Sequence, residues 1–231
     1  MERRIKMSNF NASVYFGTPV WSNDVPEFIE PINKLADKYI KNAKKNLQPS
    51  LKERDKLYKR KLGDFGLSNH SVSINTDPEA KAFSEYCGDR SYEFLDWQGF
   101  DLRNHSLHYT EMWVQEFSSK GAGHHDTHVH WNQHVTGFYF LKASEKTSMP
   151  VLHDPRPGAM MTKLPQKDGG KITYANEAVH YKVKPGTMVL IPGYTPHQYP
   201  VDLGVEPFRF VHWNIQCVPK AISNASSTPR T

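Results

Sequence analysis

The chain is poor in cysteine and in long apolar segments. Its 231 residues include two cysteines, Cys87 and Cys217, whose separation indicates neither a disulfide framework nor a zinc site. No segment approaches the roughly eighteen consecutive apolar residues that a membrane-spanning helix needs. The charged N-terminus is not followed by an apolar stretch, so the sequence shows no secretion signal. We therefore expect a cytoplasmic protein with no membrane partner.

Neither sign of charge dominates the chain, which has 29 lysines and arginines against 24 aspartates and glutamates and a net charge of +5. Residues 52–61 (K-E-R-D-K-L-Y-K-R-K) contribute to this excess. Such a mixed run is typical of a solvated helix face rather than of a nucleic-acid-binding patch, so we expect no nucleic-acid partner. A hydrophobic fraction of 38% and an aromatic fraction of 12% indicate a globular chain with one elaborated domain.

The N-terminal part of the chain combines a polar arm with an apolar segment. Residues 1–12 are expected to form a flexible arm. Residues 14–21 (V-Y-F-G-T-P-V-W) are apolar and aromatic with glycine and proline inside, which predicts an edge strand packed on the core. We expect residues 13–105 to combine this strand with supporting helices, and residues 220–231 to form a flexible tail.

Two helices are predicted before residue 105. Apolar residues recur with helical period from 25 to 43, after Asp24, which is a good N-terminal cap. Pro49 is expected to end this helix or to separate it from a short basic one, because proline lacks the backbone N–H. Asp77, which is followed by proline, predicts the start of a second helix that runs to about Tyr86, and a continuation through residues 92–95 stays open.

From residue 106 onward, short apolar segments separated by glycine and proline replace the helical pattern. Residues 107–117 (L-H-Y-T-E-M-W-V-Q-E-F) alternate apolar and polar side chains, as does a strand with one buried face. Further candidate strands are residues 136–141, 151–153, 172–175, 179–183, 187–191 and 208–216. Many short strands with such turns predict a mainly β fold, a sandwich or a barrel, over residues 106–219.

Histidine is concentrated in residues 123–141, which hold five of the twelve histidines. A neutral imidazole is a good ligand for a divalent transition metal, so the cluster indicates a metal site. Side chains at positions i and i+2 of a strand share a face and can bind one ion. His128 and His130 have this spacing. His124 and Asp126 have it too, as the histidine and carboxylate of an H-x-D pair, so two registers stay open.

A barrel brings distant strands together, so the remaining ligand is expected far along the chain. His197 is the candidate, because it follows a buried-strand pattern and a turn, V-L-I-P-G-Y-T-P. Arg209 lies in F-R-F-V-H-W-N, the predicted final strand. An arginine fork inside a barrel binds a carboxylate through two nitrogens. A structural ion pair is the alternative role for this arginine.

These motifs, in this order, resemble those of the double-stranded β-helix dioxygenases that use Fe(II) and 2-oxoglutarate. The resemblance covers roughly residues 106–219 and is greatest to a group of oxygenases common in tailed phages and marine bacteria. That group carries H-x-H-P, S-G-x-Y-Y, G-x-x-x-x-F-P, a lone histidine and R-x-S-x-x-F-N. The corresponding segments here are H-V-H-W from 128, T-G-F-Y-F from 136, G-T-M-V-L-I-P from 186, His197 and R-F-V-H-W-N from 209.

The resemblance implies a double-stranded β-helix, that is, a jelly-roll or cupin-like barrel, as the catalytic core over residues 106–219. It implies an enzyme that hydroxylates its substrate with O2 and that binds Fe(II) through His128, His130 and His197. It also implies that Arg209 binds the distal carboxylate of the cosubstrate 2-oxoglutarate, and that Tyr139 donates its hydroxyl to the same molecule. It implies no catalytic residue beyond the metal ligands.

Two other functions stay open. One is a non-enzymatic jelly-roll protein, such as an assembly or virion component, that retains a vestigial metal site. The other is a cupin-like metal enzyme that does not use 2-oxoglutarate and therefore has no need of Arg209. The sequence does not identify the primary substrate, for which a peptidyl side chain of a protein is one candidate. It also leaves open whether the chain forms a homo-oligomer.

Overall fold

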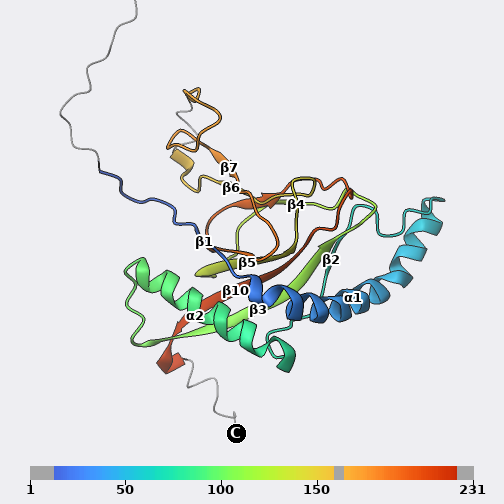
Figure 1. Cartoon of the computed structure of the whole chain (residues 1–231), viewed down its shortest axis with the longest axis horizontal. Coiled ribbons are helices and arrows are strands. Elements are labelled where there is room, and N and C mark those ends of the chain that lie inside the picture. The colour runs from blue at the N-terminus through green and yellow to red at the C-terminus, as the bar shows by residue number, and fades with distance from the viewer. Residues whose placement is uncertain (1–12, 159–163, 223–231) are drawn as a thin grey trace, which may run out of the picture.

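The computed structural model describes residues 13–158 and 164–222, so the predicted arm at 1–12 and most of the predicted tail at 220–231 lie outside the described residues. The described residues form ten β-strands, two α-helices and two short 3-10 helices (Figure 1). The helices are η1 (Pro26–Phe28), α1 (Ile29–Leu57), η2 (Pro78–Ala80) and α2 (Lys81–Trp97). The strands are β1 (Trp21–Asp24), β2 (Ser68–His70), β3 (His105–Phe117), β4 (His125–His128), β5 (Val135–Lys142), β6 (Val151–His153), β7 (Ala178–His180), β8 (Thr187–Pro192), β9 (His197–Tyr199) and β10 (Arg209–Pro219).

The strands form two antiparallel sheets that pack face to face. One sheet has the order β1-β8-β5-β10-β3-β2, and the other has the order β4-β9-β6-β7. Aromatic and aliphatic side chains of both sheets form the core between them. Helices α1 and α2 pack on the other face of the six-stranded sheet, where a second core forms (Figure 1). The predicted mainly β fold with supporting N-terminal helices is confirmed.

Side chains of β5 alternate between these two cores. Phe138 and Phe140 belong to the core between the sheets, whereas Tyr139 and Leu141 belong to the core under the helices. Because both faces are covered, nearly every residue of β5 is buried. This explains why the segment reads as a continuous apolar run rather than as an alternating one.

Strand β10 pairs with both β3 and β5 and alternates in the same way. Val211 and Trp213 pack under the helices. His212 points the other way, and its ring lies 5.2 Å from that of Phe138 between the sheets. Trp213 lies directly across from Gly137 of β5, where a Cβ atom would come within 2.1 Å of the indole. Glycine at this position therefore makes room for the tryptophan.

Helix α1 is longer than its sequence predicts. It continues through Pro49 to Leu57, although the proline removes one backbone hydrogen bond. Leu51, just beyond the proline, is buried. The carboxylate of Asp55 accepts a hydrogen bond from the Gly63 N–H at 3.0 Å. These two contacts attach the last turns to the rest of the molecule and offset the lost bond.

The second predicted helix begins where expected but extends further. The Asp77 carboxylate accepts a hydrogen bond from the Glu79 N–H at 2.8 Å and so caps η2. Helix α2 follows and ends at Trp97 rather than near Tyr86, because buried side chains continue to Leu95. Asp24, by contrast, does not cap a helix but lies in β1, where it pairs with Lys184.

Most of the predicted strands are present, but some differ from the prediction. Residues 172–175 form no strand. Ile172 and Tyr174 are both exposed, so their side chains do not pack against the rest of the protein as those of a strand would. The predicted N-terminal edge strand begins only at Trp21, where β1 pairs with β8 at the sheet edge. The short strand β2 lies outside the predicted strands and pairs with β3. In the described part of the chain no helix is long and apolar enough to cross a membrane.

Candidate metal centre

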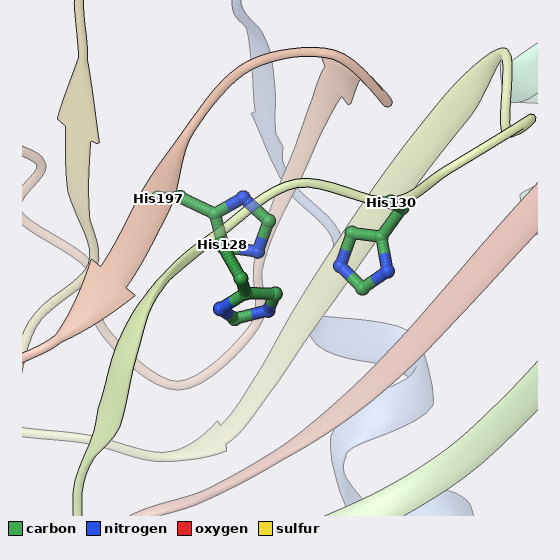
Figure 2. Close-up of side chains that lie close together, drawn as sticks. All are labelled: His128, His130 and His197. Carbon is green, nitrogen blue, oxygen red and sulfur yellow. The ribbon is translucent and has the colours of Figure 1, made fainter.

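Three histidines lie together between the two sheets. His128 ends β4, and His197 begins β9 directly across from it in the antiparallel pair. His130 lies just after β4, where its backbone N–H donates to Gly193 O at 3.0 Å. Figure 2 shows the three side chains gathered around one space between the strands. The structure thus brings together the three residues that the sequence indicates as ligands.

The spacing of the three rings suits a single ion. The ring centroids of His128 and His197 are 4.4 Å apart, and that of His130 lies 5.1 Å from the first and 5.2 Å from the second. One ligand nitrogen from each lies within 4.8 Å of the others. Nitrogens bound to one ion at about 2.1 Å are roughly 3–4 Å apart, so small side-chain rotations would bring all three into contact with it.

Backbone carbonyls set the tautomers of two of these histidines. The Nδ1 of His128 lies 2.7 Å from Asp126 O, and the Nδ1 of His197 lies 3.0 Å from Thr195 O. A carbonyl oxygen only accepts hydrogen bonds, so each Nδ1 carries the proton and each Nε2 presents its lone pair. The Nε2 of His197 is buried and has no hydrogen-bond partner. This arrangement is that of metal-ligating histidines and fits a divalent ion.

The two ring nitrogens of His130 have different surroundings. Its Nδ1 lies 2.8 Å from the amide nitrogen of Asn214, and its Nε2 is buried without a partner. In Figure 2 one ring nitrogen of His130 points toward His128 and the other points away from it. The nitrogen that points away is Nδ1, because it lies next to the ring carbon that joins the side chain to the backbone.

Burial keeps His130 and His197 neutral. Burial is the largest cause that lowers the pKa of His197 to about 3, and neighbouring histidines lower it further. Burial likewise lowers the pKa of His130 to about 3, with the charge of His212 as the next cause. At neutral pH both rings are therefore uncharged, as a metal ligand must be.

Arg209 lies on the opposite face of the six-stranded sheet from the histidines. Its guanidinium contacts Glu116 of β3 at 2.5 Å and Asp37 of α1 at 2.7 Å. Arg209 and Asn214 are five residues apart in this chain, whereas R-x-S-x-x-F-N separates the same residue types by six. One residue reverses the face of a strand. The structure thus shows the ion pair given above as the alternative, and the position of Arg209 does not support a cosubstrate role.

Tyr139 also faces the helices. Its hydroxyl donates to Val25 O at 2.6 Å, and its ring centroid lies 5.1 Å from that of Phe83 of α2. The neighbouring residue Phe138 faces the histidines instead, with its ring 5.3 Å from that of His197. Because side chains alternate along β5, the predicted contact of Tyr139 with a cosubstrate is not supported by its position either.

The structure does not bring the alternative pair to the cluster. His124 and Asp126 lie 3.9 Å apart at the surface, and the carboxylate side chain of Asp126 is 97% exposed. Neither belongs to a group of side chains that converge on one point among the described residues. The position of His128 directly across from His197 therefore favours the register that begins at His128.

A small cavity adjoins the three histidines. Its volume is 20 Å³, and its walls include the rings of Phe138, Tyr199 and Phe210. This is room for about one water molecule or ion. Histidines are the only basic side chains among the described residues that line it.

A second group of polar side chains, which the sequence did not assign to the site, lies beside His130. Glu111 of β3 and His212 of β10 converge with His130 on one point, and Asn214 contacts all three. The sequence signal available for this group was the alternation of polar and apolar side chains in the segments T-E-M-W and H-W-N. It becomes informative only when the register is known, because β3 and β10 place Glu111 directly across from Asn214.

A family model described as "Putative 2OG-Fe(II) oxygenase" matches residues 111–206. This segment contains His128, His130 and His197 but ends before Arg209. The two cofactors expected from the sequence, Fe(II) and 2-oxoglutarate, are those in the description of this family. No curated protein matches the chain.

Several solved structures are similar to this chain. AviO1 from Streptomyces viridochromogenes Tue57 is 13% identical, with a TM-score of 0.54 over 86% of this chain and 90% of its own. A prolyl-4-hydroxylase from Pseudomonas putida is 12% identical, with a TM-score of 0.47 over 85% of this chain and 92% of its own. An oxidoreductase of the 2OG-Fe(II) oxygenase family from Burkholderia pseudomallei is 12% identical, with a TM-score of 0.42 over 62% of this chain. The chain spans 59% of that protein's length. The match to AviO1 supports the fold, and the expected jelly-roll barrel is confirmed.

Proposed function

We propose that this protein is an Fe(II)-dependent oxygenase that uses 2-oxoglutarate and O2 to hydroxylate a substrate that is still to be identified. The observation that carries the proposal is the convergence of His128, His130 and His197 inside a jelly-roll barrel. The match of residues 111–206 to the oxygenase family supports it. Three protein ligands leave further coordination positions of a ferrous ion open to small molecules.

The ion would be held by the Nε2 atoms of His128 and His197, whose Nδ1 atoms are already hydrogen-bonded to the backbone. His130 would be the third ligand. When bound, iron supplies the activation of O2. The chain's own part is to fix the imidazole orientations and to keep water out. The aromatic wall serves the second purpose, since the ring of Phe138 lies 5.3 Å from that of His197.

A second candidate function is a metal-dependent barrel enzyme that does not use 2-oxoglutarate. The position of Arg209 favours it, because the side chain predicted to bind the diacid forms an ion pair on the other face of the sheet. Arg209 and Tyr139 therefore do not fit the cosubstrate. A barrel that binds no metal is disfavoured by the partnerless Nε2 atoms of His130 and His197, because a buried polar atom without a ligand destabilises the fold.

The test is reconstitution of the protein with Fe(II) under anaerobic conditions, followed by addition of 2-oxoglutarate and O2. We expect one bound iron and slow release of succinate and CO2 even without a primary substrate. His128→Ala and His197→Ala should lose both iron and turnover. His124→Ala is the matched control, because this histidine is exposed and lies outside the cluster.

The same experiment separates the two candidates. Iron binding with O2 consumption that does not depend on 2-oxoglutarate would favour the second function. A wild-type protein that binds no iron and forms no succinate would overturn the oxygenase proposal. A peptidyl side chain is one candidate for the primary substrate and is tested by adding peptides to the reconstituted protein and measuring the increase in succinate.

A further inference from the structure

We propose that the barrel holds a second divalent cation, bound by Glu111, His212, Asn214 and the Nδ1 of His130, next to the three-histidine site. Glu111 lies on β3 directly across from Asn214 of β10, and His212 points to the same side of β10 as Asn214. The Nε2 of His212 lies 3.4 Å from Glu111 Oε1, and the Nδ1 of His130 lies 3.8 Å from the same oxygen. Ligand atoms of these three residues lie within 4.8 Å of one another.

The amide group of Asn214 marks the point on which these atoms converge. Its nitrogen contacts Glu111 Oε1 and lies 2.8 Å from the Nδ1 of His130 and 3.1 Å from the Nε2 of His212. An amide nitrogen has two hydrogens and therefore makes at most two good hydrogen bonds here. Three acceptor atoms that surround one electropositive point are the arrangement that a cation requires.

Asn214 can itself become a ligand without losing its other hydrogen bond. Its Oδ1 now accepts a hydrogen bond from Thr136 Oγ1 at 2.6 Å. Rotation of the amide by half a turn would direct Oδ1 toward the cation and would direct the nitrogen toward Thr136. A hydroxyl both donates and accepts, so Thr136 remains satisfied in either orientation. The resulting set of two nitrogens and two oxygens suits a four-coordinate ion such as Zn²⁺.

The charge and accessibility of the group also suit a cation. Glu111 supplies a negative charge, and its side chain is 31% exposed, which gives an ion a route from solvent. The side chain of His212 is 4% exposed, so the opposite side of the site is closed. The pKa of His212 is lowered to about 3, chiefly by burial, so its ring is neutral and available to a metal at neutral pH.

His130 would lie between the two ions. Its Nδ1 faces Glu111 and His212, and its other nitrogen points toward His128 (Figure 2). An imidazole bound through both nitrogens carries no N–H, so binding of the second ion releases the ring proton of His130 to solvent. The two ions are thus coupled through one side chain, and the second site does not depend on 2-oxoglutarate or on turnover.

The test is titration of the metal-free protein with Zn²⁺ by calorimetry and equilibrium dialysis. We expect two equivalents in the wild type and one in Glu111→Gln, which keeps the size of the side chain but not its charge. His197→Ala should also lose one equivalent. Asp126→Asn, an exposed carboxylate close to the cluster in sequence, is the matched control and should bind two.

Asn214→Asp should have the opposite effect, because a carboxylate binds the cation more strongly than an amide does. We expect at least about tenfold tighter binding of the second equivalent. Titrations in two buffers with different ionisation enthalpies should show about one more proton released with the second ion than with the first.

A wild type that binds one equivalent, or a Glu111→Gln variant that still binds two with unchanged affinity, would overturn the second site. Absence of the additional proton would overturn the bridging role of His130. Circular dichroism establishes that each variant is folded, and His212→Gln replaces Glu111→Gln if the latter is not.

Discussion

The guanidinium of Arg209 contacts one carboxylate oxygen of Glu116 from two nitrogens, Nε at 2.7 Å and Nη2 at 2.5 Å. Lys44 of α1 contacts the other oxygen at 2.6 Å. Burial favours the neutral form of Glu116, but the hydrogen bond from Lys44 and the charge of Arg209 outweigh it, so the pKa of Glu116 is lowered. This network attaches α1 to β3 and β10, which makes Arg209 a structural residue.

Replacement of Arg209 should therefore reduce stability rather than cosubstrate affinity. We expect Arg209→Met to lower the free energy of unfolding by about 3 kcal/mol, because it leaves the half-buried Glu116 with one cationic partner. Urea denaturation measures this change. The iron content of the folded variant should equal that of the wild type, since Arg209 lies on the face away from the three histidines.

The free energy of unfolding should also be measured for Glu116→Gln and for the double variant, so that the contribution of the Arg209–Glu116 ion pair can be isolated. The double variant should be more stable than the sum of the two single effects predicts, because each single variant removes one of the two partners of the remaining charge. A stable Arg209→Met protein with a strongly raised KM for 2-oxoglutarate would contradict the structural role and would restore the carboxylate-binding role that the sequence suggested.

Tyr139→Phe should have a small structural effect only. The phenol donates a hydrogen bond to Val25 O at 2.6 Å, so its loss should lower the free energy of unfolding by about 1 kcal/mol. The KM for 2-oxoglutarate should not change. Tyr15→Phe is the control and should be neutral, because Tyr15 is 74% exposed. A raised KM without loss of stability would show instead that Tyr139 reaches the cosubstrate.

The sequence located the three-histidine group but did not indicate which face of the sheet is occupied by Arg209 and Tyr139, the two residues assigned to the cosubstrate. His128 and His197 could be found because their residue type is chemically specific and each lies at the end of a strand. The faces of Arg209 and Tyr139 could not be found in the same way. Both sides of β5 and β10 are buried, so hydrophobicity does not distinguish the helix-facing side from the side between the sheets.

The fold was likewise predictable where local sequence determines an element, and not where a tertiary contact does. Strands with turn residues on both sides, such as β6 and β8, were located nearly to the residue. Helix α1 was predicted too short, because the effect of Pro49 is local whereas the burial of Leu51 is a tertiary contact. Strand β2 is only three residues long and forms by pairing with β3, which local sequence does not encode.

Gly137→Ala should be strongly destabilising. An added Cβ would lie 2.1 Å from Cε2 of Trp213, a fully buried side chain that has no space to move. We expect a loss of about 3 kcal/mol in the free energy of unfolding, which urea denaturation measures. Gly17→Ala is the control, because no atom lies within 4 Å of the added carbon, and it should change stability by less than about 0.5 kcal/mol. Equal stability of the two variants would contradict the packing of Trp213 on this glycine.

The buried histidines should make the metal-free protein sensitive to acid. Burial is the main cause that lowers the pKa of His130, His197 and His212 to about 3. In the unfolded chain a histidine titrates near about 6.5. Below that pH the unfolded chain binds protons that the native protein does not bind, so the free energy of unfolding falls as the pH falls. Above about pH 6.5 these histidines are neutral in both the native and the unfolded state. They therefore contribute no pH dependence to the free energy of unfolding there.

Each of the three histidines should contribute up to about 1.4 kcal/mol per pH unit between pH 6.5 and pH 3. Urea denaturation in the presence of a chelator should therefore show nearly constant stability from pH 8 to pH 7 and a steep loss from pH 6 downward. His197→Gln should make this loss shallower, because one of the titrating groups is removed while His130, His212 and His125, whose pKa is lowered to about 4, remain. A free energy of unfolding that stays constant from pH 7 to pH 5 would contradict the burial of His130, His197 and His212 in their neutral form.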